Sequence, residues 1–503
     1  MIALLFIAEQ MTAQSRTLDG VEAFKKTYAI TIKNNNTVVG YAFFYRIDKV
    51  KKAYLYRLEI MDENLKTIGT NEFEGSKGLE LEDAVYESEH IMLAFTDTKK
   101  TDGVEKLSKI FDLKGKQTGE VTYDPEKVKK GMFGAAVAEE MSRYYNGYNN
   151  VEGKGFVCVF QSKAKVGGAD IQMIDQTGKL KWEKNISADK GDRMDLYLTA
   201  TTPNALVFYS IERDGIMAKD SKNFLVGLDP QTGKELYRKP MEIKEYAWEP
   251  MLFKTDDGIS YKMVATLTHE EDKFYTAKPI GFNIADFNDK TGEFTNVKDF
   301  TFEKDLSSVL DMKNESKSED GYIKMHNIVM MDDGSKVLVG EFFRKTVSAL
   351  GMASRLLSRD GGISSAQASI GDMFLLRLDK NNKAVALDRI EKSVDRVPVP
   401  EGVPIGLIQR VLGLEGNFGY LYTDYVPGTN KQTVIAEGRF DGEKFGRAAI
   451  TFDEKKGFTV KKFNVDSKGK DRVFLKRAKP GHVVVVKYSS KEKTITINLE
   501  RVD

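Results

Sequence analysis

One phrase occurs twice in this chain, with its Asp residues 54 positions apart: "MIDQTGKLKW" at 173–182 and "GLDPQTGKELY" at 227–237. In both, an apolar run ends in Asp, polar residues and a Gly follow, and a second run begins. An Asp carboxylate accepts hydrogen bonds from backbone amides two residues on, and Gly takes the positive φ that a tight turn needs. The phrase therefore predicts a strand, a tight turn and another strand, used repeatedly by one fold.

Weaker copies bring the number of these predicted turns to seven. Their aspartates are Asp62, Asp112, Asp175, Asp229, Asp289, Asp379 and Asp453. The position of positive φ holds Gly in five copies: Gly115, Gly178, Gly233, Gly292 and Gly457. Asn382 occupies it in the sixth copy, and Asn tolerates this conformation better than most residues. Leu65 occupies it in the first copy, which fits the pattern least well.

The spacing of the copies indicates the fold. Successive aspartates are 50, 63, 54, 60, 90 and 74 residues apart, and two further strand-like runs precede most copies. Three or four strands recurring at roughly fifty residues are typical of a β-propeller, in which neighbouring sheets bury one another's faces. We predict an all-β protein, a β-propeller of about seven blades (seven or eight).

The last strand-like runs leave the number of blades open. "RVFLKRA", "HVVVVKYSS" and "TITINLERV" either finish the last blade or supply an eighth. An early strand such as "TYAITIK", residues 27–33, is expected to pair with one of them, which would close the fold and remove exposed sheet edges.

Charge and cysteine content exclude some classes of function. The net charge is +1, with 76 basic and 75 acidic residues spread along the 503-residue chain. No basic face is visible that would neutralise a row of phosphates, so we expect no nucleic-acid partner. The single cysteine, Cys158 in "KGFVCVFQS", cannot form an internal disulfide or a thiolate metal site, and we expect it to be a buried strand residue.

The amino terminus predicts export. Seven apolar residues, Ile2 to Ala8, precede a small-residue patch around Thr12, Ala13 and Gln14, a pattern that resembles the end of a secretory signal. We expect cleavage after Ala13, a single propeller domain over 22–503, and a periplasmic or extracellular location. The alternative is that the run is a first strand. It is too short for a membrane span of ~20 residues, so we expect no transmembrane segment in the mature chain.

Two stretches, 124–150 and 346–369, interrupt the strand pattern. Each places apolar residues at helical spacing, and Pro125 in the first suits the first turn of a helix. The apolar positions include Val128, Met132, Phe133, Ala136, Val137 and Met141, and then Val347, Leu350, Ala353 and Leu357. We predict two short helical insertions, which either cover the face of the propeller where a partner binds or plug one end of its channel.

Four residues with polar groups are candidates for ligand binding: Asp195, Trp248, Glu249 and His326. They lie at or just ahead of runs expected to form the innermost strands of three successive blades, which line the channel of a propeller. Converging polar groups there would form a ligand pocket. The alternative is that they bond to channel water and loop amides. The "DDG" sequences at 256–258 and 332–334 are interpreted as hairpin turns rather than metal sites.

A family resemblance rests on the repeated phrase. "IDQTGKLKW" resembles the blade motif of the quinoprotein-like (PQQ-repeat-like) β-propellers, and "LDPQTGKELY" resembles it with Tyr237 in the position of Trp182. The resemblance implies that the glycine serves the turn and that the aromatic residue packs between adjacent blades. Quinone-binding members carry many docking tryptophans and commonly a vicinal cysteine pair, whereas this chain has two tryptophans and one cysteine. We therefore expect no cofactor, and the chain looks closest to secreted or periplasmic propellers without enzymatic activity.

Three hypotheses for function follow. The first is a non-enzymatic binding or scaffold protein for a protein partner or an envelope component. The second is a glycan-binding or glycan-active protein that uses the mouth of the channel. The third is a quinone-dependent dehydrogenase. The first is favoured, because the repeat is intact and none of the catalytic motifs that we sought was found.

Overall fold

The structure is a computed structural model, and it divides into two compact units. Unit 1 comprises Met1–Val128 and Asn464–Asp503, and unit 2 comprises Lys129–Phe463. The structure describes residues 14–34, 37–97, 104–126, 147–161, 167–188, 193–214, 222–243, 246–254, 261–269, 278–347, 366–392, 394–398, 419–426, 431–438, 446–453, 457–463 and 471–502.

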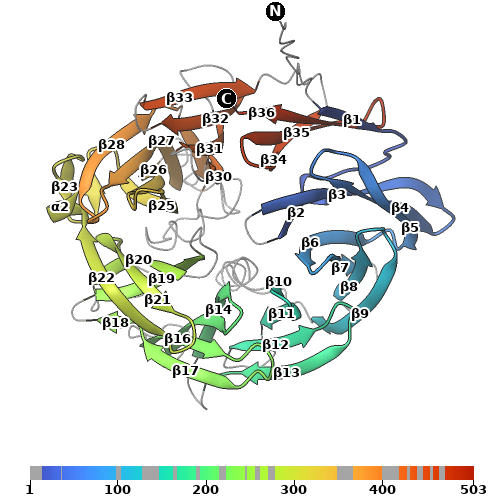
Figure 1. The fold of residues 1–503 in the computed structure, drawn as a ribbon, viewed down its shortest axis with the longest axis horizontal. Coiled ribbons are helices and arrows are strands. Elements are labelled where there is room, and N and C mark those ends of the chain that lie inside the picture. The colour runs from blue at the N-terminus through green and yellow to red at the C-terminus, as the bar shows by residue number, and fades with distance from the viewer. Residues whose placement is uncertain are drawn as a thin grey trace, which may run out of the picture. The chain divides into compact units, whose positions relative to one another are not determined.

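Unit 1 contains three antiparallel four-stranded sheets, which we call blades 1, 2 and 8 (Figure 1). Blade 1 consists of β2 (Ala29–Asn34), β3 (Thr37–Val50), β4 (Ala53–Asp62) and β5 (Thr67–Gly75). Blade 2 consists of β6 (Leu79–Glu87), β7 (His90–Asp97), β8 (Val104–Asp112) and β9 (Gln117–Glu126). Blade 8 consists of β34 (Arg472–Arg477), β35 (His482–Ser489), β36 (Thr494–Arg501) and, from the other end of the chain, β1 (Gln14–Leu18).

Unit 2 contains five more blades, numbered 3 to 7 in chain order. Blade 3 consists of β10 (Gly147–Val151), β11 (Gly155–Gln161), β12 (Ala169–Ile174) and β13 (Leu180–Ile186). Blade 4 consists of β14 (Arg193–Thr201), β15 (Leu206–Arg213), β16 (Lys222–Leu228) and β17 (Glu235–Pro240). Blade 5 consists of β18 (Glu242–Ile243), β19 (Tyr246–Lys254), β20 (Tyr261–His269), β21 (Gly281–Asn288) and β22 (Glu293–Thr301).

Blade 6 consists of β25 (Tyr322–Met330), β26 (Lys336–Val347), β27 (Ala366–Leu378), β28 (Ala384–Ile390) and β29 (Asp395–Pro398). Blade 7 consists of β30 (Tyr420–Val426), β31 (Lys431–Gly438), β32 (Gly446–Asp453) and β33 (Gly457–Phe463). Between blades 5 and 6 lie the short helix α2 (Phe302–Asp305) and the hairpin of β23 (Met312–Asn314) and β24 (Lys317–Ser318). The chain is therefore all-β, a β-propeller of eight blades, within the predicted seven or eight.

The core lies between neighbouring blades. Unit 2 has four apolar clusters, and the buried residues of each come from two consecutive blades or from the segment between them. For example, Phe208 of β15 and Ile171 of β12 belong to the cluster between blades 3 and 4. In unit 1, one cluster joins Phe474 of blade 8, Phe44 of blade 1 and Phe95 of blade 2. Because a blade cannot bury its apolar faces alone, stacking supplies the hydrophobic stabilisation.

The repeated phrase forms the turn between the third and fourth strands of a four-stranded blade. At Asp175, the carboxylate accepts hydrogen bonds from the amides of Thr177 (2.8 Å) and Lys179 (3.0 Å). Gly178 follows with φ +80° and donates its amide to the Asp175 carbonyl at 3.0 Å. Asp62, Asp112 and Asp379 make the same pair of amide contacts. The predicted turn chemistry is confirmed at these positions.

Two details of the turns differ from the prediction. Leu65 does not break the pattern: it adopts φ +63°, and its burial in the unit 1 core offsets the strain. In blade 5, Asn288 rather than Asp289 caps the turn, accepting the Lys290 amide at 3.0 Å. The turn is longer than at Asp175, because Gly292 donates its amide to the carbonyl of the residue four positions back.

Blade 8 explains why seven turns accompany eight blades. Its third strand, β36, pairs with β1 from Gln14↔Leu499 to Leu18↔Ile495. These two strands come from opposite ends of the chain, so no turn joins them and no copy of the phrase exists. The predicted pairing of an early strand with the final runs is confirmed, but the strand is β1, which lies before the expected domain start at residue 22. Most of "TYAITIK" belongs to β2, which pairs with β3 in blade 1.

The predicted helical insertions fall largely outside the described residues, which exclude 127–146 and 348–365. Their ends are strands rather than helices. Pro125 lies in β9 and Val347 in β26, where the ladder continues to Val347↔Ala366. Cross-strand pairing overrides the helical spacing there. In the described part of the chain, the helices are α2 and one 3₁₀ turn (Lys26–Tyr28), and none is long and apolar enough to cross a membrane.

Candidate functional site

The four predicted site residues lie on the strands where we expected them. Asp195 is on β14, Trp248 and Glu249 are on β19, and His326 is on β25. The described residues include the backbone of Trp248 and Glu249 but not their side chains. Asp195 forms an ion pair with the buried Arg213 of its own blade, whereas His326 faces Glu341 in blade 6. The described contacts of these residues therefore lie in separate blades.

His326 belongs to a buried charged group that we call the Glu341 cluster: His326, Glu341, Lys392 and Tyr420. Glu341 is 0% exposed. Its Oε2 lies 2.8 Å from the Lys392 Nζ, and its Oε1 lies 3.3 Å from the His326 Nε2. The same carboxylate accepts the backbone amide of Tyr420 at 2.8 Å and that of Gly419 at 3.3 Å.

Local irregularities of two strands accompany this cluster. The pairing register shifts between Met325 and Asn327 in β25, on either side of His326, and between Glu341 and Phe343 in β26. Such bulges re-aim side chains. The His326 ring stacks on that of Tyr420, with centroids 4.9 Å apart and planes 7° apart. The cluster therefore joins blade 6 to the first strand of blade 7.

The charges of the cluster follow from its burial and contacts. Burial alone would raise the pKa of Glu341, but contacts with His326 and the Lys392 ammonium outweigh it and lower this pKa to about 2. Burial lowers the pKa of His326, against the opposing effect of Glu341. A carboxylate offers about four acceptor sites, and four protein groups surround this one. The cluster is therefore suited to holding two blades together rather than to acid–base chemistry.

Sequence reasoning identified His326 but missed Glu341 and Lys392. A signal for Glu341 existed, because a single charged residue interrupts the apolar run "VLVGEFF", and buried charges are paired. Lys392 carried no comparable signal. The predicted hairpin turn at 332–334 is confirmed, since Asp333 accepts the amide of Ser335 at 2.8 Å. The other "DDG" sequence, at 256–258, lies outside the described residues.

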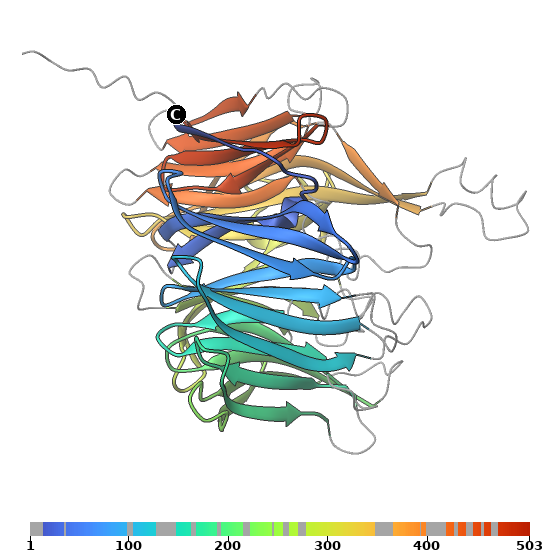
Figure 2. The same ribbon diagram turned by 90° about the vertical axis from the view of Figure 1, so that its right-hand side faces the viewer.

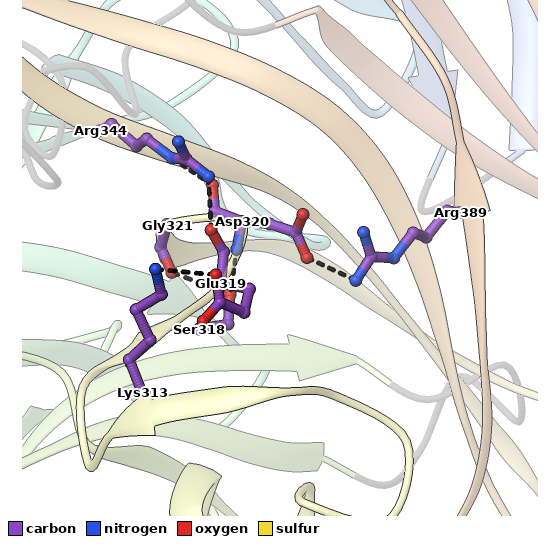
Figure 3. Close-up of polar contacts among 7 residues, drawn as sticks. All are labelled: Lys313, Ser318, Glu319, Asp320, Gly321, Arg344 and Arg389. Carbon is purple, nitrogen blue, oxygen red and sulfur yellow. Dashed lines mark hydrogen bonds and ion pairs between the residues drawn. The ribbon is translucent and has the colours of Figure 1, made fainter.

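A second polar group braces the hairpin of β23 and β24 against blade 6 (Figure 3). Arg344 of β26 donates to the carbonyl of Asp320 at 2.9 Å and also to that of Glu319. Arg389 of β28 pairs with the Asp320 carboxylate, and Lys313 pairs with Glu319 at 2.7 Å. Two arginines from different strands therefore fix a segment that belongs to neither blade 5 nor blade 6.

Two strands of blade 6, β26 and β27, extend beyond the four-stranded part of the sheet at the end near Asp320. β26 and β27 continue as an arm from Arg344↔Ser369 to Val347↔Ala366, beyond the last partners of β25 and β28 (Figure 2). β29 pairs with β27 along this arm. Val394, just before β29, is 56% exposed and is the most exposed of the large apolar residues in the described part of the chain. We call the arm, β29 and the braced hairpin the blade 6 elaboration.

Comparison with known proteins places the chain in a family. A family model described as "Family of unknown function (DUF6770)" matches residues 1–503. The chain belongs to this family. No curated protein matches it.

Within the described part of the chain, no group of three His, Cys, Asp or Glu side chains is placed to hold a metal ion.

Several solved structures are similar to this family member in fold. They include the β-propeller domain of the Trilobed protease from Pyrococcus furiosus (13% identity, TM-score 0.35, 85% of this chain and 96% of that chain). A europium-containing methanol dehydrogenase has 10% identity and a TM-score of 0.38, over 95% and 93% of the two chains. The quinohemoprotein alcohol dehydrogenase from Comamonas testosteroni has 11% identity and a TM-score of 0.32, over 82% and 68%. At these values the likenesses carry no argument about function.

Proposed function

We propose that this chain is an exported, non-enzymatic binding protein that holds a protein partner or another envelope component at the blade 6 elaboration. The observation that carries the proposal is the arm of β26 and β27, with β29 paired to β27 beside it. At the same end of the blade, Arg344 and Arg389 hold the hairpin of β23 and β24 in place through Asp320. Binding residues lie disproportionately on connecting segments that a rigid scaffold holds in place.

Three features support this surface. The arm extends past the partners of β25 and β28, so its outer part is not needed to complete the four-stranded sheet. Val394 is exposed at the base of the arm, two residues before the exposed Arg396, and arginine is enriched in protein interfaces. The braced hairpin adds rigidity, which lowers the entropic cost of binding.

The matched pair Val394 and Val385 tests the surface. Val385 is 52% exposed on the same blade, at the opposite end of β28. A partner captured from an envelope fraction would be identified, purified and titrated against wild type, Val394→Asp and Val385→Asp. We expect Val394→Asp to weaken binding by about tenfold or more and Val385→Asp to leave it within about twofold. Equal loss in both variants, or none in either, would exclude this surface.

Export makes a separate prediction about the mature amino terminus. Cleavage after Ala13 would leave all of β1, Gln14–Leu18, available to pair with β36. We expect fractionation to place the protein outside the cytoplasm, and mass spectrometry of the mature chain to give Gln14 as its first residue. A chain that stays in the cytoplasm and keeps Met1 would contradict export, although not the binding surface.

A further inference from the structure

One buried carboxylate holds both ends of the segment that carries β29. Residues 393–418 lie between Lys392, which follows β28, and Gly419, which precedes β30, and their described part includes β29. Glu341 lies 2.8 Å from the Lys392 Nζ at one end and accepts the Gly419 amide at 3.3 Å at the other. The two ends also meet, since a Cβ on Gly419 would lie 3.1 Å from the Lys392 Nζ. We call these contacts of Glu341 the clasp.

Other contacts fix each end of the segment separately. The backbone amide of Lys392 donates to the Asp372 carboxylate of β27 at 3.1 Å, and the Gly419 carbonyl accepts the backbone amide of Glu437 of β31 at 2.7 Å. Asp372 thus holds one end to blade 6 and Glu437 holds the other to blade 7, whereas Glu341 contacts both. If the clasp opens, each end stays on its own blade, and the two ends can separate.

His326 makes the clasp sensitive to acid. Its side chain is 6% exposed, its Nε2 lies 3.3 Å from the Glu341 Oε1, and its ring stacks on that of Tyr420 of β30. Among the described residues, the other charged groups that act on it are Lys392 and, on its own strand, Lys324. While His326 is neutral, the Glu341 carboxylate is balanced by the Lys392 ammonium. Protonation adds a second cation to a buried cluster that contains one carboxylate, which is costly.

The electrostatics give the direction of the effect. Burial lowers the pKa of His326, Glu341 opposes this change, and the Lys324 and Lys392 ammonium groups add to it. Opening hydrates the ring and returns its pKa towards the ordinary value of 6.5. Because the open form binds the proton more tightly, its share rises as the pH falls below about 6.5. Glu341 stays ionised in this range, since its pKa is about 2.

We propose that His326 is the sensor of a pH-dependent clasp, in which acidification releases the base of residues 393–418 and loosens the surface around β29. The effect on partner binding rests on the proposed function, because that surface binds the partner there. The opening of the clasp itself does not depend on that function.

Hydrogen–deuterium exchange of the full-length protein, corrected for the intrinsic effect of pH, tests the clasp. Protection of β29 in wild type should fall by about tenfold between pH 7.5 and 5.5, as expected for one proton and an ordinary pKa of 6.5. The side chain in His326→Gln cannot be protonated, so protection in this variant should change by less than about twofold. The matched control is His269→Gln, which should respond as wild type does, because His269 pairs with Glu315 at 3.2 Å but both side chains are partly exposed.

Equal loss of protection in His326→Gln and wild type, or no loss in wild type, would overturn the proposal. Nuclear magnetic resonance titration of the His326 ring in wild type decides the question if His326→Gln folds poorly. The ring should titrate below pH 6.5, together with the loss of β29 protection. A titration midpoint at or above 6.5 would also overturn the clasp.

The partner separates this proposal from the proposed function. A partner that binds the closed surface makes His326 harder to protonate, because linkage is reciprocal, so adding it should lower the pH at which β29 loses protection. An unchanged pH would show that the clasp does not regulate binding. If no partner is captured, or Val394→Asp leaves its affinity unchanged, the proposed function fails, and exchange still decides on the clasp. If Val394→Asp weakens binding but exchange is independent of pH, the clasp fails and the binding surface stands.

Discussion

Replacement of Glu341 by Gln is expected to lower the free energy of unfolding by about 3–5 kcal/mol, the usual result when one partner of a buried ion pair is removed. Gln is the same size and keeps an oxygen for the Tyr420 amide, so the main loss is the charge that faces the buried Lys392 ammonium at 2.8 Å. Urea unfolding of wild type and variant at pH 7 measures the difference.

Glu437→Gln is the control for this prediction. Glu437 pairs with Arg447 at 3.0 Å in blade 7, but both side chains are partly exposed, so we expect a loss of about 0–1 kcal/mol. A second substitution, Lys392→Met, should recover part of the stability lost in Glu341→Gln, because it removes the uncompensated cation. If the two Glu→Gln variants unfold alike, the Glu341 cluster does not stabilise the junction of blades 6 and 7.

The pH dependence of stability provides a second measurement for the same residue. The pKa of Glu341 in the folded protein, about 2, lies below its ordinary value of 4.5. A lowered carboxyl pKa stabilises the fold above the ordinary value, and this contribution is lost as the pH falls from about 4.5 towards 2. The difference in stability between wild type and Glu341→Gln should therefore shrink over this interval. A difference that stays constant would mean that the carboxylate charge is not the cause.

Replacement of Tyr237 by Ala is expected to cost about 3–5 kcal/mol, the range for removing a buried aromatic ring. Tyr237 is 8% exposed, and its ring packs on Gly292 of the next blade so closely that a Cβ there would lie 2.4 Å from the ring. The loss would open a cavity in the core between blades 4 and 5. Thermal and urea unfolding measure the effect.

The neighbouring residue and the hydroxyl supply two controls. Leu236 is 44% exposed, so Leu236→Ala should change stability by less than about 0.5 kcal/mol. The buried Tyr237 hydroxyl has no hydrogen-bond partner in the described part of the chain, and burial raises its pKa. Tyr237→Phe should therefore be as stable as wild type or more stable. A large loss in Tyr237→Phe would show that the hydroxyl, not the ring, makes the main contribution.

The blade architecture could be predicted because its determinants are local. Asp175, Gly178 and Trp182 lie within eight residues, and each of their roles requires one residue type at one spacing. The structure adds why the glycines recur: Trp182 packs on Gly233 of the next blade and donates to the carbonyl of Pro230 at 3.0 Å. Glycine thus serves the turn and also admits the aromatic ring, as the resemblance implied.

The parts that could not be predicted depend on contacts between distant residues. The Glu341 cluster joins residues 326, 341, 392 and 420, and no local spacing relates them. A tertiary contact also explains why Asn288, and not Asp289, caps the turn of blade 5. The Asp289 carboxylate instead accepts hydrogen bonds from the side-chain amide of Asn204 in blade 4, at 3.0 and 3.2 Å. The two residues are 85 positions apart in the chain. Local patterns identify turns, and tertiary contacts decide which residue performs each role.

The pairing of β1 with β36 has a consequence for the order of folding during synthesis. Blade 8 takes one strand from residues 14–18 and three from residues 472–501, so it cannot be completed until nearly the whole polypeptide has left the ribosome. Unit 2 is continuous in sequence and has no such requirement. The strand β1 is therefore an exception to the usual progression from the amino end: it is made first and is among the last to find its partner.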